Sequence, residues 1–327
     1  MPKPLISIIT VNYNQAPVTC ALLESIRQQE YAEVEVIVVD NASREDPQRM
    51  LLARYPDIKY VRSERNLGFA GGNNLGLREA TGSYLFFINN DAELTAGCLT
   101  RLVALLRNTP GSGMVSPLIC YYPLEGQKMP SIIQYAGMTP VHPITARNRM
   151  IGQGEVANGR FEHPQKTAYA HGAAMLVSRE VLEKVGPMAD DFFLYYEELD
   201  WCERIRRAGY SVWIEPRARV YHKESLTVQA LGALKTYYIN RNRIYFMQRN
   251  YGGLHLALFY AYLLAVVVPK STVLMALRGE WANLQAFWQG IGWNFGVKDN
   301  SWERLNNAAP IRSALATSLA NGKGVAQ

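Results

Sequence analysis

The sequence predicts an α/β protein with a mainly parallel sheet flanked by helices, followed by a C-terminal helical region. Strand-like and helix-like patterns alternate over the first hundred residues, as they do where helices join parallel strands. The strand-like runs are almost continuously apolar, which is typical of strands covered on both faces. After about residue 225 the alternation stops and long apolar segments follow, so we divide the chain into 1–225 and 226–327.

The first hundred residues contain four predicted strands and four predicted helices. Runs of β-branched and aliphatic residues predict the strands, and apolar residues at helical spacing predict the helices. The strands are expected over 5–11, 34–39, 58–61 and 84–88, and the helices over 18–29, 46–54, 74–80 and 98–108. Parallel strands end at one edge of a sheet, and ligands in such folds bind outside that edge.

The regular pattern is lost between 119 and 166, where Pro, Gly, Tyr and basic residues follow one another without a clear period. This segment predicts loops and short strands. Regular structure resumes with a strand over 173–177 and helices over 179–185 and 197–207. Two further strands are expected over 210–214 and 218–221.

The segment 254–268 is strongly apolar and is interrupted by Pro269 and Lys270. It is shorter than the ~20 residues that a helix needs to cross a bilayer, so we expect an interfacial or re-entrant helix. A buried helix of a C-terminal bundle is the alternative. Basic residues beside such a helix each add roughly 1 kcal/mol of attraction to anionic lipid, which predicts association with an anionic membrane surface. These residues are Arg241, Arg243, Arg249, Lys270 and Arg278.

Composition narrows the class of protein. Hydrophobic residues make up 48% and charged residues 19% of the 327, so the chain is able to bury a core. A net charge of +6 suits nucleic acid, an anionic membrane or a phosphate-bearing substrate without selecting among them. The four cysteines lack C-x-x-C spacing, which argues against a zinc knuckle or a disulfide framework. No apolar leader precedes the first strand, and the expected location is cytoplasmic.

Polar side chains directly follow three of the predicted strands. Asn12, Asp40 and Asp91 each come just after an apolar run, so we expect them at one edge of the sheet. Asp40 in this place could accept hydrogen bonds from a ribose hydroxyl or a base N–H, with an Asx turn or a helix N-cap as the alternative. The segment RNLGFAGGNN at 65–74 precedes a predicted helix and lets backbone N–H groups approach an anion.

The motif FINNDAEL at 87–94 carries Asn89, Asn90 and Asp91 to the tip of a hydrophobic strand without a turn glycine. Oxygen ligands at a strand tip suit a hard divalent cation, Mg²⁺ or Mn²⁺, which would bridge a diphosphate. A strand-terminating turn, in which Asn and Asp are also favoured, is the alternative.

A second acidic cluster opens the predicted helix 197–207. Acids in a first helical turn ordinarily complement the helix dipole. The lead-in DDFFLYY is apolar, however, and an acid at a partly apolar cleft could act as a general base. His222 follows a predicted strand and is either a metal ligand or a surface residue. The acids of the cluster are Glu197, Glu198, Asp200 and Glu203.

Taken together, these segments resemble the inverting, nucleotide-sugar-dependent glycosyltransferases of family two, which have the GT-A fold and its nucleotide-binding sheet. The resemblance covers about residues 5–225 and is nearest to the bacterial rhamnosyltransferase-like branch. Each motif is ordinary alone, whereas seven in this order and at this spacing are highly specific. The motifs are SIITVNYN, VIVVDNAS, RNLGFAGGNN, FINNDAEL, HGAAMLVSREVLEKVG, FFLYYEELDWCERIRRAGY and VYHKES.

The resemblance implies a role for each matching residue. Glu198 stands where the family has its catalytic base, more often an Asp, and the longer side chain alters its reach. Asp91 matches the last acid of the D-x-D motif and should bind the metal, while Asn89 replaces the first acid. His222 matches a histidine that completes the metal site in some relatives. The residues that it implies in nucleotide binding are Thr10, Asn12, Asp40, Asn66, Gly68, Asn74, Asn89 and Asn90.

The resemblance also implies an activity and its partners. An enzyme of this branch moves a sugar from a nucleotide-sugar donor to a lipid-linked or oligosaccharide acceptor in cell-surface polysaccharide synthesis. The implied donor is dTDP-L-rhamnose, with another UDP- or GDP-hexose as the alternative, and the implied cofactor is Mg²⁺ or Mn²⁺. The C-terminal apolar segment and its basic neighbours predict a peripheral location, on the inner face of the bacterial cell membrane. No nucleic-acid partner is expected.

Two other classes of protein compete with this interpretation. A nucleotidyltransferase would carry a glycine-rich loop with a nearby basic residue directly after the first strand, and TVNYNQAPV lacks one. A catalytically silent binding module or membrane scaffold is the second alternative. The presence of both Asp91 and an acid at position 198 argues against it.

Overall fold

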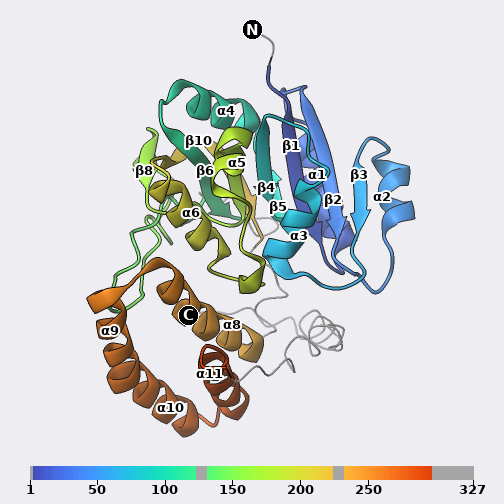
Figure 1. Ribbon diagram of the computed structural model, residues 1–327. Coiled ribbons are helices and arrows are strands. Elements are labelled where there is room, and N and C mark those ends of the chain that lie inside the picture. Colours follow the sequence, from blue (N-terminus) through green and yellow to red (C-terminus); the bar gives the residue numbers. More distant parts are fainter. Residues whose placement is uncertain (1–2, 123–130, 224–231, 297–327) are drawn as a thin grey trace.

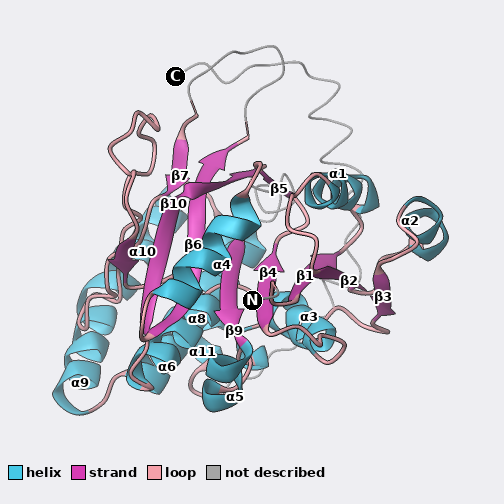
Figure 2. Cartoon of the chain, turned by 90° about the horizontal axis from the view of Figure 1, so that it is seen from above, coloured by secondary structure: helices cyan, strands magenta, loops and turns pink. Residues whose placement is uncertain are grey.

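A computed structural model describes residues 3–122, 131–223 and 232–296. Its centre is a ten-stranded sheet with helices on both faces (Figures 1 and 2). The main path of the sheet runs β3-β2-β1-β4-β9-β6-β10-β5, and β7 and β8 pair with β6 and β10. The strands are β1 (Ile6–Asn12), β2 (Val34–Asp40), β3 (Lys59–Arg62), β4 (Tyr84–Ile88), β5 (Ala92–Leu94), β6 (Ser112–Tyr121), β7 (Ile133–Tyr135), β8 (Gln165–Thr167), β9 (Ala174–Ser178) and β10 (Ser211–His222).

The helices lie between the strands in the first 222 residues and follow one another after them. The α-helices are α1 (Ala16–Arg27), α2 (Gln48–Arg54), α3 (Gly68–Leu77), α4 (Cys98–Asn108), α5 (Arg179–Val185), α6 (Glu197–Arg207), α8 (Gly232–Asn250), α9 (Gly253–Tyr262), α10 (Val268–Leu277) and α11 (Trp281–Trp293). A 3₁₀ turn, η1 (Asp190–Phe192), precedes α6, and a π-helical turn, η2 (Leu263–Val267), joins α9 to α10.

The predicted α/β class with a mainly parallel sheet is confirmed. Strands β3, β2, β1 and β4 are parallel to one another, and β9 lies antiparallel between β4 and β6. Strands β6 and β10 pair in parallel, so both end at the same edge as β1, β2 and β4. The register places Asn12, Asp40 and Arg62 side by side at that edge.

Helix α3 begins at Gly68, six residues before the predicted helix start at 74. The glycines of this segment predict poor helicity on propensity alone, and packing outweighs that preference. A Cβ on Gly76 would lie 2.7 Å from Ile9 and 2.8 Å from Val39, so the missing side chain lets the helix lie close against β1 and β2.

Two strands are longer than the sequence predicts. Strand β6 begins at Ser112 and is buried over almost its whole length, although the sequence predicts no strand over 109–118. The strands expected over 210–214 and 218–221 are one strand, β10, with a register shift between Glu215 and Arg219. Pro216 within this irregularity lacks the N–H of a regular ladder, which explains why the local pattern resembles two strands.

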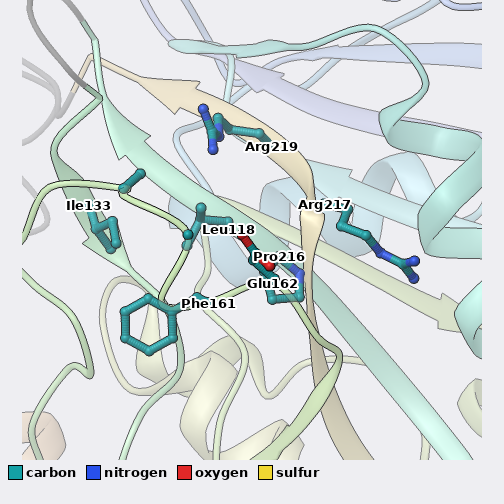
Figure 3. Close-up of a pocket in the computed structure, with 9 residues that line it drawn as sticks. Leu118, Ile133, Phe161, Glu162, Pro216, Arg217 and Arg219 are labelled. Carbon is teal, nitrogen blue, oxygen red and sulfur yellow. The ribbon is translucent and has the colours of Figure 1, made fainter.

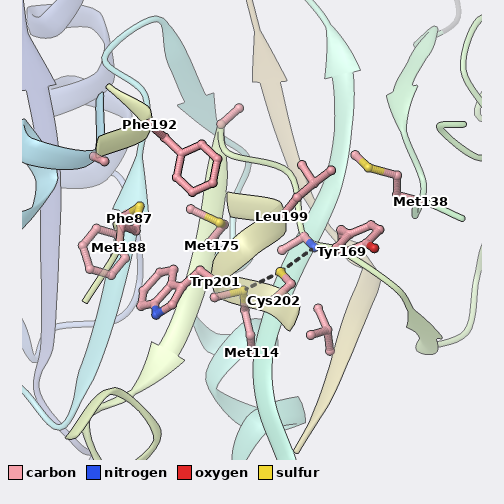
Figure 4. Close-up of a cluster of buried hydrophobic side chains, with 14 of the residues drawn as sticks. Phe87, Met114, Met138, Tyr169, Met175, Met188, Phe192, Leu199, Trp201 and Cys202 are labelled. Carbon is pink, nitrogen blue, oxygen red and sulfur yellow. Dashed lines mark hydrogen bonds between the residues drawn. The ribbon is translucent and has the colours of Figure 1, made fainter. Parts of the chain in front are cut away.

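Each face of the sheet has its own hydrophobic core. Helices α1 and α4 cover one face, and α3, α5 and α6 cover the other. On the second face the Trp201 ring meets Phe87 edge-to-face at 5.3 Å, and the Trp201 indole N–H donates to the Gly186 carbonyl at 2.9 Å. Figure 4 shows Trp201 and Cys202 of α6 directed toward strands β4, β9 and β6. These contacts fix α6 against the sheet.

The C-terminal helices extend the second core. Helices α8 and α11 lie against each other below the sheet (Figure 1). Buried side chains from α8, α9 and α11 belong to the same core cluster as those of α6, so the described part of the C-terminal region, 232–296, packs directly on the sheet domain. The predicted domain boundary at 225 lies outside the described residues. The buried side chains are Ile244, Phe246, Met247, Phe259, Phe287 and Ile291.

The predicted break at Pro269 is wrong. Helices α9 and α10 and the π turn between them form one continuous helix, Gly253–Leu277, of 25 residues. Proline is tolerated in the first turn of a helix, where its N–H would lack a partner, and Pro269 lies in the first turn of α10 after the wider π turn. The helix is long enough and apolar enough to cross a membrane.

Candidate active site

The predicted site residues come together at the edge where β1, β2, β4, β6 and β10 end. Strand β9 runs the other way, so the loop before it, containing His171 and Gly172, reaches the same edge. The short strand β5 pairs antiparallel with the end of β10 and sets Ala92 opposite His222. The start of α6 closes the site from the second face of the sheet.

Asn12 and Asp40 form the buried part of the expected nucleoside side. Asn12 Nδ2 donates to Asp40 Oδ1 at 2.8 Å and lies 3.2 Å from Ser43 Oγ. Asp40 Oδ2 also pairs with Arg62 Nη1 at 3.0 Å. Sequence reasoning missed Arg62 as a residue of the site. Its one sign in the sequence is its place at the end of the neighbouring strand.

A chain of hydrogen bonds joins this pair to the FINNDAEL turn. Thr19 Oγ1 donates to Asn12 Oδ1 at 2.9 Å, and Asn90 Nδ2 donates to Thr19 Oγ1 at 3.1 Å. Thr10 lies two residues inside the edge, and its buried hydroxyl has no hydrogen-bond partner among the described residues. Asn12 and Asn90 are therefore held at the edge, whereas Thr10 lies beneath it.

Asn41, which sequence reasoning missed, organises the glycine segment. Its Nδ2 donates to Asn66 Oδ1 at 2.9 Å and to the Gly68 carbonyl at 3.1 Å, while its Oδ1 accepts from Leu67 N at 2.8 Å. Gly68 has a φ of +72°, and a Cβ there would lie 2.3 Å from the Phe193 carbonyl oxygen. Only glycine fits this place, because the loop before α6 passes directly over it.

Asn74 has a different place from the other predicted nucleotide residues. Its Nδ2 donates to the Met188 carbonyl at 2.8 Å and also contacts the Asp190 carboxylate. These partners lie before and within η1. Asn74 thus ties α3 to the segment that leads into α6.

Asp91 and His222, the two predicted metal ligands, are neighbours. His222 Nε2 lies 3.1 Å from Asp91 Oδ1 and 3.3 Å from Asn89 Nδ2. Gln134 Oε1 lies 2.8 Å from His222 Nδ1, so Nδ1 carries the proton that it donates to the amide oxygen. In that tautomer Nε2 and Oδ1 both present lone pairs to the space between them, as two ligands of one cation would.

These residues fit a divalent cation that is only partly held by protein. A carboxylate oxygen and an imidazole nitrogen suit Mn²⁺ or Mg²⁺, which commonly keep positions for substrate phosphates. No group of three or more His, Cys, Asp or Glu side chains arranged to hold a metal exists in residues 3–122, 131–223 and 232–296. Gln134, found only in the structure, gives His222 the outer partner that orients a ligating imidazole.

His171 forms an uncharged wall of the site. Its ring centre lies 6.1 Å from that of His222 and 5.4 Å from that of Tyr135. Burial, together with the nearby His222, lowers the pKa of His171 to about 3. The neutral ring accepts a hydrogen bond from Ala173 N at 3.1 Å through Nδ1, which fixes the loop before β9.

The two adjacent acids at the start of α6 face different surroundings. Glu198 is half-buried, and its carboxyl carbon lies 3.9 Å from where a Cβ on Gly172 would be. Glu198 therefore faces the loop before β9 at the sheet edge. Glu197 is only 4% exposed, and Arg241 of α8 is the cation that acts on it.

Burial gives both acids unusual proton affinities. It raises the pKa of Glu198 to about 7, against the opposing effect of backbone N–H groups at the start of α6. Burial and the adjacent Glu198 carboxylate raise the pKa of Glu197 well above its ordinary value. Glu197 therefore holds its proton more tightly than an ordinary Glu, and Glu198 has a pKa near 7, which is the range that suits a general base.

A separate hollow of about 280 Å³ lies beside the irregular part of β10 (Figure 3). Leu118, Ile133 and Phe161 are among its apolar lining residues, and Glu162, Arg217 and Arg219 are its charged ones. None of the predicted site residues lines it. We do not assign it a role in the site.

Comparison with known proteins agrees with this geometry. The model of the family described as "Glycosyl transferase family 2" matches residues 7–186. The chain belongs to this family. The match includes the strand ends, the glycine segment and the FINNDAEL turn, and it ends just before η1 and α6. The family assignment thus confirms the resemblance seen in the sequence motifs.

The chain is similar to proteins named as sugar transferases. It is 29% identical over 211 residues to the low-salt glycan biosynthesis hexosyltransferase Agl10 of Haloferax volcanii, covering 63% of each chain. It is 24% identical over 238 residues to the N-acetylglucosaminyl-diphospho-decaprenol L-rhamnosyltransferase of Mycobacterium tuberculosis, covering 68% of this chain and 76% of that one. A third relative, the uncharacterized protein y4gI of Sinorhizobium fredii, is 29% identical, but the alignment spans only 25% of its length.

Solved structures show the same fold. The mannosyltransferase PcManGT from Pyrobaculum calidifontis, in complex with GDP-Man and Mn²⁺, aligns with 98% of this chain and 81% of its own at a TM-score of 0.54 and 20% identity. GalNAc-T7 with UDP, GalNAc and Mn²⁺ aligns with 67% of this chain and 43% of its own at a TM-score of 0.56 and 15% identity. The fold is therefore GT-A.

Proposed function

We propose that the protein is an inverting, nucleotide-sugar-dependent hexosyltransferase that uses Glu198 as its general base. The observation that carries this proposal is the position of Glu198. Its half-buried carboxyl opens toward Gly172 at the sheet edge that also holds Asp91 and His222. Among the acids at the start of α6, Asp200 is bound to Arg204 and Arg249, and Glu197 is buried away from that loop.

The chemistry follows from these surroundings. The Glu198 carboxylate takes the proton of an acceptor hydroxyl as the oxygen attacks the anomeric carbon. The bond to the nucleoside diphosphate breaks on the opposite face, so a single displacement inverts the anomeric centre. A general base within hydrogen-bond reach typically contributes about 10²–10⁴-fold to the rate.

Asp91 and His222 are proposed to hold the divalent cation, with Asn89 beside them. When bound, the cation would supply Lewis-acid stabilisation of the departing diphosphate. Gln134 keeps the His222 imidazole in the tautomer whose Nε2 has a lone pair to offer a cation. Asn12 and Asp40, with the segment that Asn41 organises, are proposed to hold the nucleoside side of the donor.

The proposed donor is dTDP-L-rhamnose, with a UDP- or GDP-hexose as the alternative. The rhamnosyltransferase name of the Mycobacterium tuberculosis relative supports the first choice. The fold shared with PcManGT, which was solved with GDP-Man, keeps the second open. Release of nucleoside diphosphate should be measured with dTDP-L-rhamnose, UDP-glucose, UDP-N-acetylglucosamine and GDP-mannose in the presence of Mn²⁺. Turnover with a UDP- or GDP-sugar but not with dTDP-L-rhamnose would overturn the donor proposal.

The proposed acceptor is a lipid-linked glycan at the inner face of the cell membrane. The helix Gly253–Leu277 supports this proposal because large apolar side chains along it are exposed, among them Leu254 at 72%, Leu264 at 60% and Leu277 at 80%. An exposed apolar surface of this kind marks a membrane or protein contact. The helix lies on the same side of the sheet domain as α6 and α8 (Figure 1).

Two of the basic residues predicted to attract lipid are not free to contact it. Arg241 is only 4% exposed, and Arg249 is paired with Asp200 at 2.9 Å. Lys270 and Arg278 are exposed beside the apolar helix. We therefore propose that apolar contact, rather than positive charge, supplies most of the attraction to the membrane.

A further inference from the structure

The loop that leads into α6 has an unusual backbone. Phe193, Tyr195 and Tyr196 have φ angles of 62°, 70° and 76°. Large aromatic residues rarely adopt positive φ, and such conformations persist only when the surrounding structure imposes them. Tyr196 directly precedes Glu197 and Glu198, so the direction of the Glu198 side chain depends on how this loop is held.

One side chain of α8 holds most of the loop. Asn242 is fully buried, and its Nδ2 donates to the carbonyl oxygens of Phe192, Leu194 and Tyr195 at 2.9, 2.7 and 2.9 Å. The side-chain amide has two N–H donors, and the three carbonyl oxygens share these two donors. Within the described residues no other side chain contacts as many carbonyls of this loop.

Asn242 and Arg241 together form a clamp on this loop, and Arg241 orients the Asn242 side-chain amide. Its Nε donates to Asn242 Oδ1 at 2.8 Å, which leaves Nδ2 facing the loop, and its Nη2 donates to the Phe192 carbonyl at 2.8 Å. The guanidinium lies 4.6 Å from the ring centre of Trp293 and 4.8 Å from that of Tyr238. These rings hold it by cation–π contact in a place from which water is excluded.

The loop also touches the expected donor side. The Phe193 carbonyl accepts a hydrogen bond from Phe69 N at 2.6 Å, immediately after Gly68. The Phe193 ring stacks on Tyr238 of α8 with centres 5.0 Å apart and planes at 13°. One short loop therefore contacts the glycine segment on one side and α8 on the other.

From these contacts we infer that Asn242 and Arg241 are positioning residues for Glu198, and that α8 is thereby part of the catalytic unit. The inference rests on the proposed function, because it assigns a role in the reaction of the same site. Asn242 and Arg241 do not touch the reacting atoms. They hold the carbonyls of Phe192, Leu194 and Tyr195, and this holds Tyr196 at positive φ. The first turn of α6 then directs the Glu198 carboxyl toward Gly172.

The test is Asn242→Ala, compared with Asn240→Ala as a matched control. Asn240 lies on the same helix, but its amide donates to the Thr236 carbonyl at 2.7 Å and not to the loop. We expect Asn242→Ala to lower kcat by about 10–10²-fold, since a misplacement of about 1 Å has effects of this size. Donor affinity should change less than kcat, because Asn12, Asp40 and Asp91 are left intact. The control should keep the kcat of the unaltered protein.

The pH profile distinguishes positioning from mere support of the fold. A released loop admits water to Glu198, so the acidic limb of kcat/KM should move from about 7 toward the ordinary Glu value near 4.3. An unchanged kcat overturns the inference. So does a loss of activity that matches the unfolded fraction measured by circular dichroism, with the acidic limb left in place.

A second variant and a hydrogen-exchange measurement complete the test. If Asn242→Ala does not fold, Arg241→Lys replaces it, because lysine keeps the charge but cannot bond to Asn242 and the loop together; the expected and contrary results are the same. Hydrogen exchange of the peptide covering 190–200 should be faster in the variant than in the unaltered protein and needs no substrate. If the unaltered protein turns over no donor, the proposed function fails, while unchanged exchange in the variant means that the clamp itself fails.

Discussion

His222 Nε2 lies 3.1 Å from Asp91 Oδ1 because strand β5 pairs with the last residues of β10. Asp91 comes from the turn after β4, whereas His222 ends the last strand of the sheet. Gln134 of β7 holds the other imidazole nitrogen. Segments that are distant in sequence thus meet at the proposed cation site, and this arrangement leads to the first prediction.

Asp91→Asn should weaken both metal-dependent donor binding and turnover. Loss of an outer partner alone usually costs about 10–100-fold in metal affinity, so loss of the carboxylate should cost at least about tenfold. Calorimetric titration of UDP or dTDP with and without Mn²⁺ measures the effect. A variant whose Mn²⁺-dependent affinity equals that of the unaltered protein would show that Asp91 does not hold the cation.

Glu198→Gln should lower turnover by about 10²–10⁴-fold, because the amide keeps the size and hydrogen bonding of the acid but cannot take a proton. Donor affinity should be unchanged, since Asn12, Asp40 and Asp91 are left intact. Glu197→Gln is the control, with turnover near that of the unaltered protein. Near-normal turnover of a folded Glu198→Gln protein, with loss in the control, would mean that Glu197 is the base.

The rate should depend on pH through Glu198. Only the ionised carboxylate accepts a proton, and burial raises the pKa of this group to about 7. We therefore expect kcat/KM to fall about tenfold per pH unit below 7 and to level off above it. Initial rates between pH 5 and 9 measure this. A profile that stays flat down to pH 5 would contradict the assignment.

Glu197→Gln should stabilise the protein, and more so as the pH rises. The folded state holds the Glu197 proton at a pKa raised well above the ordinary value, while the unfolded chain loses it near 4.3. The free energy of unfolding therefore falls as the pH rises from about 4.3 toward the folded pKa, and glutamine removes this dependence. Urea unfolding at pH 5 and pH 8 compares the two proteins. An equal difference at both pH values would show that Glu197 is not held neutral.

The protein should float with liposomes that contain anionic lipid. Burying one leucine is worth about 1.5–3 kcal/mol, so Leu264→Lys should weaken partitioning at least about tenfold. Replacing Lys270 and Arg278 by glutamine should have a smaller effect, because apolar contact supplies most of the attraction. If the unaltered protein stays wholly in the soluble fraction at low salt, the membrane proposal is wrong.

Local patterns in the sequence were sufficient for the class of fold and for many of the residues at the site edge. One strand and three helices have the predicted bounds, because their apolar spacing is strong and turn residues flank them. They are the strand 84–88 and the helices 98–108, 179–185 and 197–207. Parallel strands share one edge, so residues directly after them had to meet there. Asn12, Asp40 and Asp91 could be placed by this rule alone.

The remainder depends on contacts between segments that no local pattern links. The start of α3 at Gly68 and the helix through Pro269 are decided by close packing and by a π turn, against local propensity. Helical spacing cannot separate Glu197 from Glu198, since adjacent residues differ only in what lies opposite them. The fold places Gly172 opposite one and Arg241 near the other. Desolvation depends on this burial, so only the tertiary structure assigns each acid its proton affinity.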